Sequence, residues 1–401
     1  MNAGRLLAWP DTGRGARRAW CGALLAAFAL WAALAAWNTG GQRALFFDEG
    51  RDLLGDFWMP KTCLEEGYAP LGEDASAERS GWSDGRMRVC ARDRCYPAPA
   101  LMPLKLFPAT WGGAWAWTAC VALVLAAALC AVARGWWPLA LMGTMPVLFA
   151  VERGNTIGLS AAAVAVFLAW YRSERRGRRR MAALALACAA CLKVSPALLG
   201  LLYLPQRDWK GMAWCAAFGA VLFVVPWWFV PGGFAALPDF VANAGENAAA
   251  YARTAEFGLV PVWRAVRILL GQDCQQTWNG CMAAMRASQA AGVALVALGA
   301  WRRSECAAVV GMLWAAGNMH YYGALYLVPL FALALACPTA CALPRGRRCV
   351  QAACWFAILC PVQLVVAGHA ANALLCNAAA VVLAVLHVSC PSRKMKMEEA
   401  T

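Results

Sequence analysis

The chain has 401 residues, of which 62% are apolar, only 14% are charged and 21 are tryptophan. An average soluble domain is about 45–50% apolar and about 25% charged, so this composition excludes disordered, fibrous and coiled-coil proteins and small disulfide scaffolds. The net charge of +14 would suit a nucleic-acid binder, but the basic residues gather between apolar stretches, as is typical of loops that anchor membrane helices. The composition therefore predicts an all-α, polytopic integral membrane protein that forms a single membrane domain over residues 1–401.

Apolar stretches recur along the chain and predict about 12 membrane helices, some of them short or broken, since a straight span needs about 20 apolar residues. Two stretches must each cross the membrane twice for the topology to be consistent. One is predicted to break near Lys193 and the other near Asn318 and His320. The stretches cover residues 20–37, 111–133, 137–151, 157–171, 181–204, 212–230, 290–301, 306–336, 350–367 and 370–388.

The distribution of Lys and Arg predicts which helix ends face the cytoplasm. The segment 172–180 holds six arginines and is the strongest cytoplasmic marker. With this segment inside, the other basic clusters between spans lie on the same side, and both termini are cytoplasmic. Arg14, Arg17 and Arg18 precede the first stretch, which we interpret as an uncleaved anchor because no small-residue cleavage site stands out after it. The predicted location is the inner (plasma) membrane.

Two loops are long enough to carry a function, and the predicted topology places both outside the cytoplasm. The first covers residues 38–110, directly after the first helix, and the second covers residues 232–286. In an oxidising compartment, the spacing of cysteines in these loops allows two short disulfide loops. The pairs are Cys90 with Cys95 and Cys274 with Cys281.

Two polar clusters lie beside spans on the predicted outer side. In the first, Asp48 and Asp56 lie among aromatic residues that would hold them near the lipid headgroups. A partly desolvated carboxylate there can act as a general base on a hydroxyl, although a solvated acidic loop is the simpler interpretation. The second is the turn Glu152-Arg153-Gly154-Asn155. Arg153 at a helix end can bind an anion, and the alternative is a plain interfacial turn.

Two further clusters lie at the predicted breaks. Lys193 interrupts an apolar stretch just before Pro196, so it needs a partner or an aqueous cavity unless it snorkels to the outer surface. His320 stands between Asn318 and two tyrosines, where it either lines a polar cavity or is a satisfied structural histidine. All four clusters map to the outer face, and together they place a carboxylate and cations at one membrane level. A reaction between a lipid-linked phosphate donor and a hydroxyl acceptor requires this combination.

Several motifs of nucleotide and metal enzymes are absent from the sequence. It contains no Walker phosphate loop, no glycine-rich dinucleotide fingerprint, no GxSxG elbow and no HExxH pair, and its three histidines are scattered. Cys188-Ala-Ala-Cys191 is interpreted as helix packing rather than as a metal site. We therefore expect no cofactor, no metal centre and no ATP-driven transport.

Short motifs also occur in a characteristic order. A Gly-Asn turn, a span, a basic loop, a Lys-x-x-Pro motif and a basic-Trp turn follow one another between residues 152 and 210. Upstream lie Gly55-Asp56-Phe57 and Tyr96-Pro97-Ala98-Pro99, and downstream lies His320-Tyr321-Tyr322. In order and content these motifs resemble glycosyltransferase family 87, polytopic enzymes of the GT-C class that include polyprenyl-phosphate-mannose-dependent α-mannosyltransferases.

The resemblance implies a GT-C-like fold and a membrane glycosyltransferase of the cell envelope. It would move a mannose-like hexose from a polyprenyl-phosphate donor to a lipid or glycan hydroxyl on the extracytoplasmic face. Asp56 would be the general base, with Asp48 as its rival, in an inverting single displacement. Lys193, His320 and Arg153 would hold the donor phosphate. The implied partners are the donor, the acceptor and the bilayer, without a cofactor or nucleic acid, and the second loop is the candidate for defining the acceptor.

Two other classes of protein stay open at this point. A polytopic transporter or lipid flippase would also make natural use of an intramembrane lysine and a broken helix, although no internal repeat is visible in the sequence. A non-catalytic scaffold would make the four polar clusters incidental. The enzyme hypothesis differs from both in one expectation, which is that Asp56, Lys193 and His320 converge on one cavity.

Overall fold

The computed structural model of the chain describes residues 14–39, 53–72, 80–83, 86–272, 278–336, 345–360, 365–366, 369–370 and 372–389. Asp48, the rival base, and Cys274 lie outside the described residues.

Helices dominate the described part of the chain, and strands occur in it only as two short antiparallel hairpins, β1 (Gly81–Ser83) with β2 (Arg86–Arg88) and β3 (Val365–Val366) with β4 (His369–Ala370). The α-helices are α2 (Arg14–Thr39), α3 (Gly55–Glu66), α4 (Ala98–Leu101), α5 (Trp111–Ala133), α6 (Met145–Glu152), α7 (Ile157–Trp170), α8 (Arg176–Leu192), α9 (Trp209–Val224), α10 (Leu237–Tyr251), α11 (Val260–Leu269), α12 (Trp278–Trp301), α13 (Glu305–Ala315), α14 (Leu327–Ala336), α15 (Arg345–Leu359) and α16 (Asn372–Val388). Short 3-10 helices connect them: η1 (Ala91–Asp93), η2 (Met102–Leu106), η3 (Trp137–Gly143), η4 (Ser195–Gln206), η5 (Val225–Phe229), η6 (Gly233–Ala236), η7 (Ala252–Thr254) and η8 (Tyr321–Tyr326).

Three of the described helical segments are long and apolar enough to cross a membrane, namely Trp111–Ala133, Trp209–Phe229 and Asn279–Trp301. The chain is therefore a helical, polytopic membrane protein, and the larger number of spans inferred from the sequence stays a prediction. Shorter apolar helices within the described ranges are Ile157–Trp170, Glu305–Ala315, Tyr321–Ala336 and Leu374–Val388.

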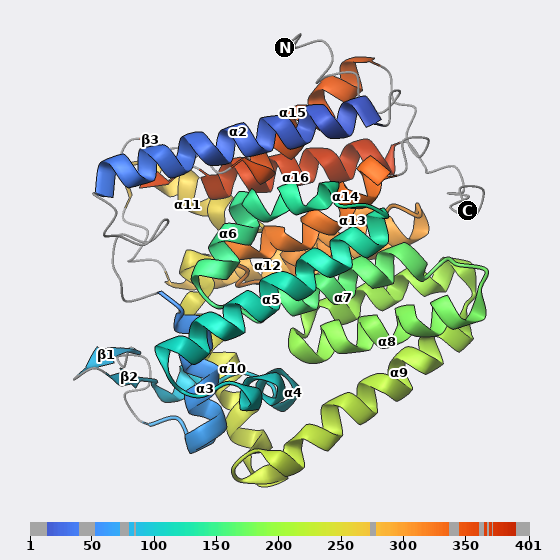
Figure 1. Cartoon of the computed structure of the whole chain (residues 1–401). Helices are drawn as coiled ribbons and strands as arrows, with labels where there is room; N and C mark the ends of the chain where they lie inside the picture. The colour runs from blue at the N-terminus through green and yellow to red at the C-terminus, as the bar shows by residue number, and fades with distance from the viewer. Residues whose placement is uncertain are drawn as a thin grey trace.

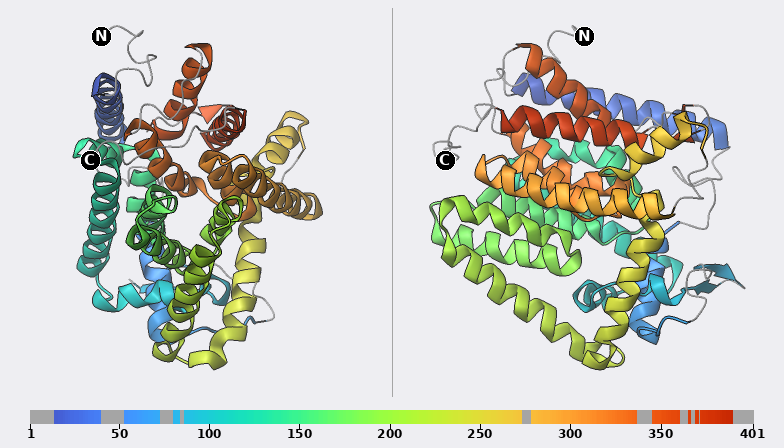
Figure 2. Two further views of the ribbon diagram at one scale, coloured as in Figure 1. Left: turned by 90° about the vertical axis from the view of Figure 1, so that its right-hand side faces the viewer. Right: turned by 180° about the vertical axis from the view of Figure 1, so that it is seen from behind.

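The helices form one bundle. In Figure 1, α2, α5, α7 and α16 cross the view in roughly the same direction, and α9 runs along the lower edge beside α8. From behind, α12 lies across the bundle (Figure 2), and α10 packs against η1 of the first loop. The main core includes Ala161 of α7, Val309 of α13 and Phe331 of α14, all fully buried.

Small residues let α12 and α13 pack closely. A Cβ added to Gly292 would lie 2.3 Å from the Ala315 backbone nitrogen, and one added to Gly311 would lie 2.6 Å from the Gly292 carbonyl oxygen. Lipid tails are as apolar as the helices, so helix association in membranes depends on such close contact between backbones. The glycine- and alanine-rich apolar stretches thus provide the packing surfaces of the bundle.

Both apolar stretches that the sequence predicts to break do so. α8 ends one residue before Lys193, which has an extended backbone, and Pro196 lies in the first turn of η4. The second stretch breaks between Ala315, the last residue of α13, and Tyr321, where η8 begins. Each break leaves its polar residue, Lys193 or His320, at a helix end rather than inside a helix.

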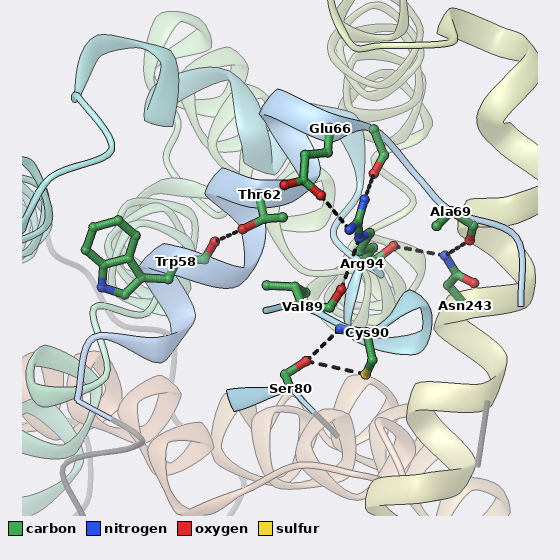
Figure 3. A network of polar contacts seen from close by, with 10 residues as sticks. Trp58, Thr62, Glu66, Ala69, Ser80, Val89, Cys90, Arg94 and Asn243 are labelled. Carbon is green, nitrogen blue, oxygen red and sulfur yellow. Dashed lines mark hydrogen bonds and ion pairs between the residues drawn. The ribbon is translucent and has the colours of Figure 1, made fainter. Parts of the chain in front are cut away.

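The two long loops pack against each other through a polar network (Figure 3). Arg94 of the first loop donates hydrogen bonds to Glu66 Oε2 (2.6 Å) and to the Gly67 carbonyl oxygen (3.1 Å) at the end of α3. Asn243 of α10 donates its side-chain amide to the carbonyl oxygens of Ala69 (3.0 Å) and Arg94 (3.4 Å). Because Asn243 is fully buried, the second loop is in firm contact with the segment that follows α3.

The first loop keeps Cys90 and Cys95 as separate thiols. The Cys90 thiol donates to Asp93 Oδ2 (3.2 Å) and accepts from Ser80 Oγ (3.3 Å). Burial raises the pKa of the Cys90 thiol. The disulfide that the spacing of Cys90 and Cys95 allows is therefore not formed in this structure.

Candidate active site

Main-chain contacts between the first outer loop and the turn after α6 place Asp56. The Leu54 nitrogen donates to the Glu152 carbonyl oxygen and the Asp56 nitrogen donates to the Arg153 carbonyl oxygen, each over 2.9 Å. Leu54 has a left-handed backbone with φ 56°, which turns the chain into α3. Asp56 thus lies in the first turn of α3, where the free N–H groups of a helix start favour a negative charge.

Two side chains of this turn hold the Asp56 carboxylate. Arg153 donates from Nε to Oδ2 over 2.7 Å and from Nη2 to Oδ1 over 3.2 Å. Asn155 Nδ2 donates to Oδ2 over 2.6 Å. Asp56 is only 5% exposed, so these bonds lie away from bulk water, where charge-assisted pairs are strong. Arg153, for which the sequence predicts contact with the donor phosphate, thus binds the carboxylate here.

Gly154 lies between the two residues that bind the carboxylate, and its conformation requires glycine. Its φ is +66°, and an added Cβ would lie 3.3 Å from Phe57 Cβ. Trp117 Nε1 donates to the Gly154 carbonyl oxygen over 2.9 Å. Asn155 Oδ1 accepts a hydrogen bond of 2.8 Å from the first backbone N–H of α7. The turn is therefore fixed from both sides, and it can bring both side chains to Asp56.

Lys193 lies between two tyrosine rings. Its Nζ is 5.7 Å from the ring centroid of Tyr96 and 5.8 Å from that of Tyr322. The Tyr96 hydroxyl also donates to Asp56 Oδ1 over 3.3 Å, so one side chain touches both the carboxylate and the ammonium. Within the described ranges, no hydrogen bond or ion pair involves the Lys193 ammonium. Its three N–H donors are therefore available to a ligand.

His320 reaches the same group of side chains from the start of η8. Its ring centroid lies 5.7 Å from that of Tyr322 and 6.0 Å from that of Tyr251 at the end of α10. The charges of Arg153 and Lys193 both act on it. His320 thus lies between the lysine and the second outer loop. We call the residues around Asp56 the Asp56 cluster: Asp56, Tyr96, Arg153, Asn155, Lys193, His320 and Tyr322.

The electrostatics of the cluster keep Asp56 ionised. Burial alone would raise the pKa of Asp56, because a desolvated carboxylate is disfavoured. The charge and hydrogen bond of Arg153, the charge of Lys193 and the hydrogen bond from Asn155 outweigh burial and hold the pKa of Asp56 below its usual value. At neutral pH the group is therefore a carboxylate that can accept a proton.

A second carboxyl group, Glu256 of the second outer loop, borders the cluster. Its Oε2 accepts a hydrogen bond from the Tyr321 backbone nitrogen. Burial raises the pKa of Glu256 to about 7, against the opposing effects of that hydrogen bond and of the charges on Arg264 and Arg153. Glu256 is therefore close to half-protonated near neutral pH.

The candidate residues that the structure describes all lie in the cluster, although they come from segments far apart in the sequence. Tyr96, Asn155 and Tyr322 in the cluster, and Glu256 at its border, are additions to which sequence reasoning gave no role in the site. Tyr96 belongs to a Tyr-Pro motif that marked the segment without indicating a role for the side chain. No local pattern marks Glu256, because its contact depends on how the second loop folds. The four predicted members are Asp56, Arg153, Lys193 and His320.

The chemistry of the cluster combines two capacities. A buried, ionised carboxylate can accept a proton from a bound hydroxyl. An ammonium held between aromatic faces, with a neighbouring imidazole, can bind and stabilise an anion.

Comparison with known proteins adds the family. The model described as glycosyltransferase family 87 matches residues 96–320, more than half of the chain. The match begins at Tyr96 and ends at His320, so it includes Arg153 and Lys193, whereas Asp56 precedes it. No curated protein and no solved structure matches the chain. With its membrane helices and this extent of match, the chain belongs to glycosyltransferase family 87 and is a membrane glycosyltransferase.

Proposed function

We propose that the protein transfers a mannose-like hexose from a polyprenyl-phosphate donor to a hydroxyl of a lipid or glycan acceptor, with the GT-C mode of action. The reaction is an inverting single displacement on the extracytoplasmic face of the inner membrane, with Asp56 as the general base. One contrast carries the proposal. Asp56 is bonded by Arg153, Asn155 and Tyr96, whereas Lys193, joined to it through Tyr96, has no hydrogen-bond partner in the described part of the chain.

Lys193 and His320 are the proposed ligands of the donor phosphate. A phosphate oxygen can accept from the free N–H donors of the lysine, in surroundings where charge pairs are stronger than in water. The imidazole of His320 can donate one further hydrogen bond. Arg153 already uses two donors on Asp56; we propose that it orients the base and adds positive charge near the phosphate.

The displacement balances without a second carboxylate. The acceptor oxygen attacks the anomeric carbon and forms the new glycosidic bond, while its proton passes to Asp56. The bond between the anomeric carbon and the phosphate oxygen breaks, and polyprenyl phosphate leaves with the electron pair. Lys193 and His320 stabilise the charge that develops on the leaving phosphate. One in-line attack inverts the anomeric centre, because no covalent sugar–enzyme intermediate forms.

The position of Lys193 along α8 supports an extracytoplasmic site. α8 has 17 residues and is therefore about 25 Å long at 1.5 Å per residue. Its first turns carry Arg176, Arg178 and Arg179, part of the basic segment that marks the cytoplasmic side. Lys193 follows its last residue, at the end of α8 opposite these arginines, and we propose that this end faces the extracytoplasmic side.

The test is a transfer assay in membranes. Membranes with wild type, Asp56→Asn or Glu65→Gln are incubated with radiolabelled polyprenyl-phosphate hexoses, and label in the lipid and glycan fractions is measured. Asp56→Asn should reduce the rate about 10²- to 10⁴-fold, the usual contribution of a general base. Glu65 lies on the same helix with a side chain 51% exposed, so Glu65→Gln should transfer like wild type.

Two outcomes would contradict parts of the proposal. Equal transfer by wild type and Asp56→Asn would remove Asp56 from the mechanism and make Asp48 the residue to replace next. An absence of transfer from every polyprenyl-phosphate hexose, in membranes where the protein is present, would contradict the donor class.

A further inference from the structure

One residue of the second outer loop binds the chain on both sides of His320. The Glu256 backbone nitrogen donates to the Met319 carbonyl oxygen over 2.9 Å. The Tyr321 backbone nitrogen donates to Glu256 Oε2. His320, between Met319 and Tyr321, is thus bracketed by two hydrogen bonds to the same residue.

The bond to Tyr321 acts at a helix start. η8 begins at Tyr321, and its N-cap residue is His320, with an extended backbone and no side-chain cap of its own. The first N–H groups of a helix have no partner inside the helix and need an acceptor from elsewhere. Glu256 supplies that acceptor from a distant segment. The orientation of His320 at the start of η8 therefore depends on the Glu256 carboxyl group.

The position of Glu256 is itself fixed by its neighbours. Ala255 and Phe257 are both buried. The Gly258 backbone exchanges two hydrogen bonds with the Asn377 side chain of α16, of 3.1 Å from its nitrogen and 2.9 Å to its oxygen. Arg264 of the same loop donates to the Ala255 carbonyl oxygen over 3.5 Å. The packed part of the second loop therefore fixes Glu256, and Glu256 in turn fixes the backbone around His320.

We propose that Glu256 is a positioning residue that holds His320 in place for the donor phosphate. The inference rests on the proposed function, because it assigns Glu256 to the donor half of that site. The second outer loop then contributes to donor binding as well as being the candidate for acceptor recognition. The group acts through hydrogen-bond acceptance at one oxygen, so an uncharged acceptor of the same shape should replace it.

The first experiment measures steady-state kinetics of Glu256→Ala, Glu256→Gln and the loop control Glu246→Ala with the polyprenyl-phosphate hexose that wild type uses. Glu256→Ala should raise the KM for the donor about tenfold and change the KM for the acceptor little. Glu256→Gln keeps a carbonyl oxygen at the same place and should stay within about twofold of wild type, as should Glu246→Ala. Glu246 lies on α10, and its side chain makes no hydrogen bond or ion pair with the described residues. A fall in kcat shared by both substrates, or a glutamine variant as impaired as alanine, would overturn the proposal.

A double-mutant cycle separates positioning of His320 from a general structural role. In a His320→Ala background the ring that Glu256 orients is gone, so Glu256→Ala should have no further effect on the donor KM. Residues that act through one another are non-additive in this way. An effect of Glu256→Ala as large in that background as in wild type would show that Glu256 does not act through His320.

A readout that needs no sugar donor keeps the inference apart from the proposed function. Diethyl pyrocarbonate modifies accessible histidines, and mass spectrometry can follow His320 separately from the other two histidines of the chain. Glu256→Ala should speed modification of His320 several-fold, and Glu256→Gln should react like wild type. If Glu256→Ala fails to fold, Glu256→Asp, which keeps the charge and shortens the reach, takes its place. An unchanged rate in the folded variants would overturn the inference, whatever the outcome of the transfer assay.

Discussion

At the residue scale, Lys193 is an unusual half-buried cation, since its ammonium has two aromatic faces around it and no carboxylate oxygen within 4 Å in the described ranges. A cation over an aromatic face gains about 0.5–1 kcal/mol when exposed and about 2 kcal/mol when desolvated. The two rings therefore hold the lysine in place without neutralising its charge. A carboxylate partner would have reduced its attraction for a phosphate.

This arrangement predicts different effects for two substitutions of Tyr322. Tyr322→Leu removes one aromatic face and should raise the KM for the donor about two- to thirtyfold, the range that about 0.5–2 kcal/mol corresponds to. Tyr322→Phe keeps the ring and should stay within about twofold of wild type. The measurement is the donor KM at saturating acceptor. Equal effects of leucine and phenylalanine would mean that the hydroxyl group, rather than the ring face, is what the site uses.

Glu256 predicts a pH dependence of stability. Its pKa in the folded protein is raised to about 7 from an ordinary value of 4.5, because burial disfavours the ionised form. The folded state therefore holds this proton over a pH range in which the unfolded state has lost it. The contribution of protonated Glu256 to the free energy of unfolding is fully present below about pH 4.5 and is lost as the pH rises through about 7.

The check is a thermal melt of the detergent-solubilised protein at several pH values. The melting temperature of wild type should fall, relative to that of Glu256→Gln, as the pH rises from about 4.5 to about 7. Glutamine does not titrate, so Glu256→Gln lacks the pH-dependent contribution of Glu256 to stability and keeps the contributions of all other titratable groups. A difference between the two that is flat or rises over this interval would contradict the assignment of a raised pKa to Glu256.

The sequence predicts which residues belong to the site better than it predicts which of them bond to one another. Asp56, Lys193 and His320 are costly polar groups beside apolar stretches, which makes them recognisable in a sequence. The partner of Arg153 is not recognisable in the same way. A guanidinium beside a helix end can bind a phosphate and a carboxylate equally well. Here the main-chain docking of Leu54 and Asp56 brings the Asp56 carboxylate to the Arg153 side chain.

At the element scale, the turn between α6 and α7 connects the base to the bundle. Its Gly154 has φ +66° and little room for a Cβ. An L-residue with a side chain costs about 1–2 kcal/mol in this left-handed conformation, and a displacement here moves Arg153 and Asn155 together. The turn is thus the element on which the geometry of Asp56 depends most.

Gly154→Ala is therefore expected to lower the melting temperature by a few degrees and to reduce transfer more than tenfold. The matched control is Gly177→Ala on α8, where an added Cβ meets nothing within 4 Å and an alanine should stabilise the helix by about 0.5–1 kcal/mol. Melting curves and the transfer assay on the two variants test this pair. A Gly154→Ala protein that transfers like wild type would show that the turn tolerates the change without moving Asp56.

The helix breaks could be predicted because two independent patterns agree on them. Pro196 and the charge of Lys193 disfavour a continuous helix, and the orientation of the basic loops requires an extra crossing at the same place. The extent of η4 as a 3-10 helix over Ser195–Gln206 could not be predicted in this way. Apolar residues alone do not distinguish its tighter geometry from an α-helix.

At the scale of the whole molecule, the arrangement of charge predicts a topology that can be measured directly. Fusion of alkaline phosphatase after Gly177, inside the arginine-rich segment, should give an inactive, cytoplasmic reporter. Fusion after Gly271 in the second loop should give an active one, because this enzyme folds only outside the cytoplasm. An active fusion at Gly177 would place Lys193 at the cytoplasmic side and contradict an extracytoplasmic reaction.

The association of the two outer loops is the part of the molecule that the sequence indicates least. Its contacts are single hydrogen bonds between distant segments, such as those from Asn243 to Ala69 and Arg94, and the bond from Tyr321 of η8 to Glu256 of the second loop is of the same kind. Such contacts carry no periodicity and no spacing rule. They follow only after the helices have packed, and for this reason Glu256 is visible in the structure and not in the sequence.

The docking of Leu54 and Asp56 onto residues 152 and 153 includes two hydrogen bonds between backbone atoms. Backbone partners alone impose no demand on side-chain identity, but the Leu54 side chain is fully buried and its backbone has φ 56°, so this position constrains the register that brings the acid into place. A designer who wishes to reshape what the enzyme accepts should therefore leave Leu54 unchanged, because the proton acceptor two residues later depends on the turn that it forms.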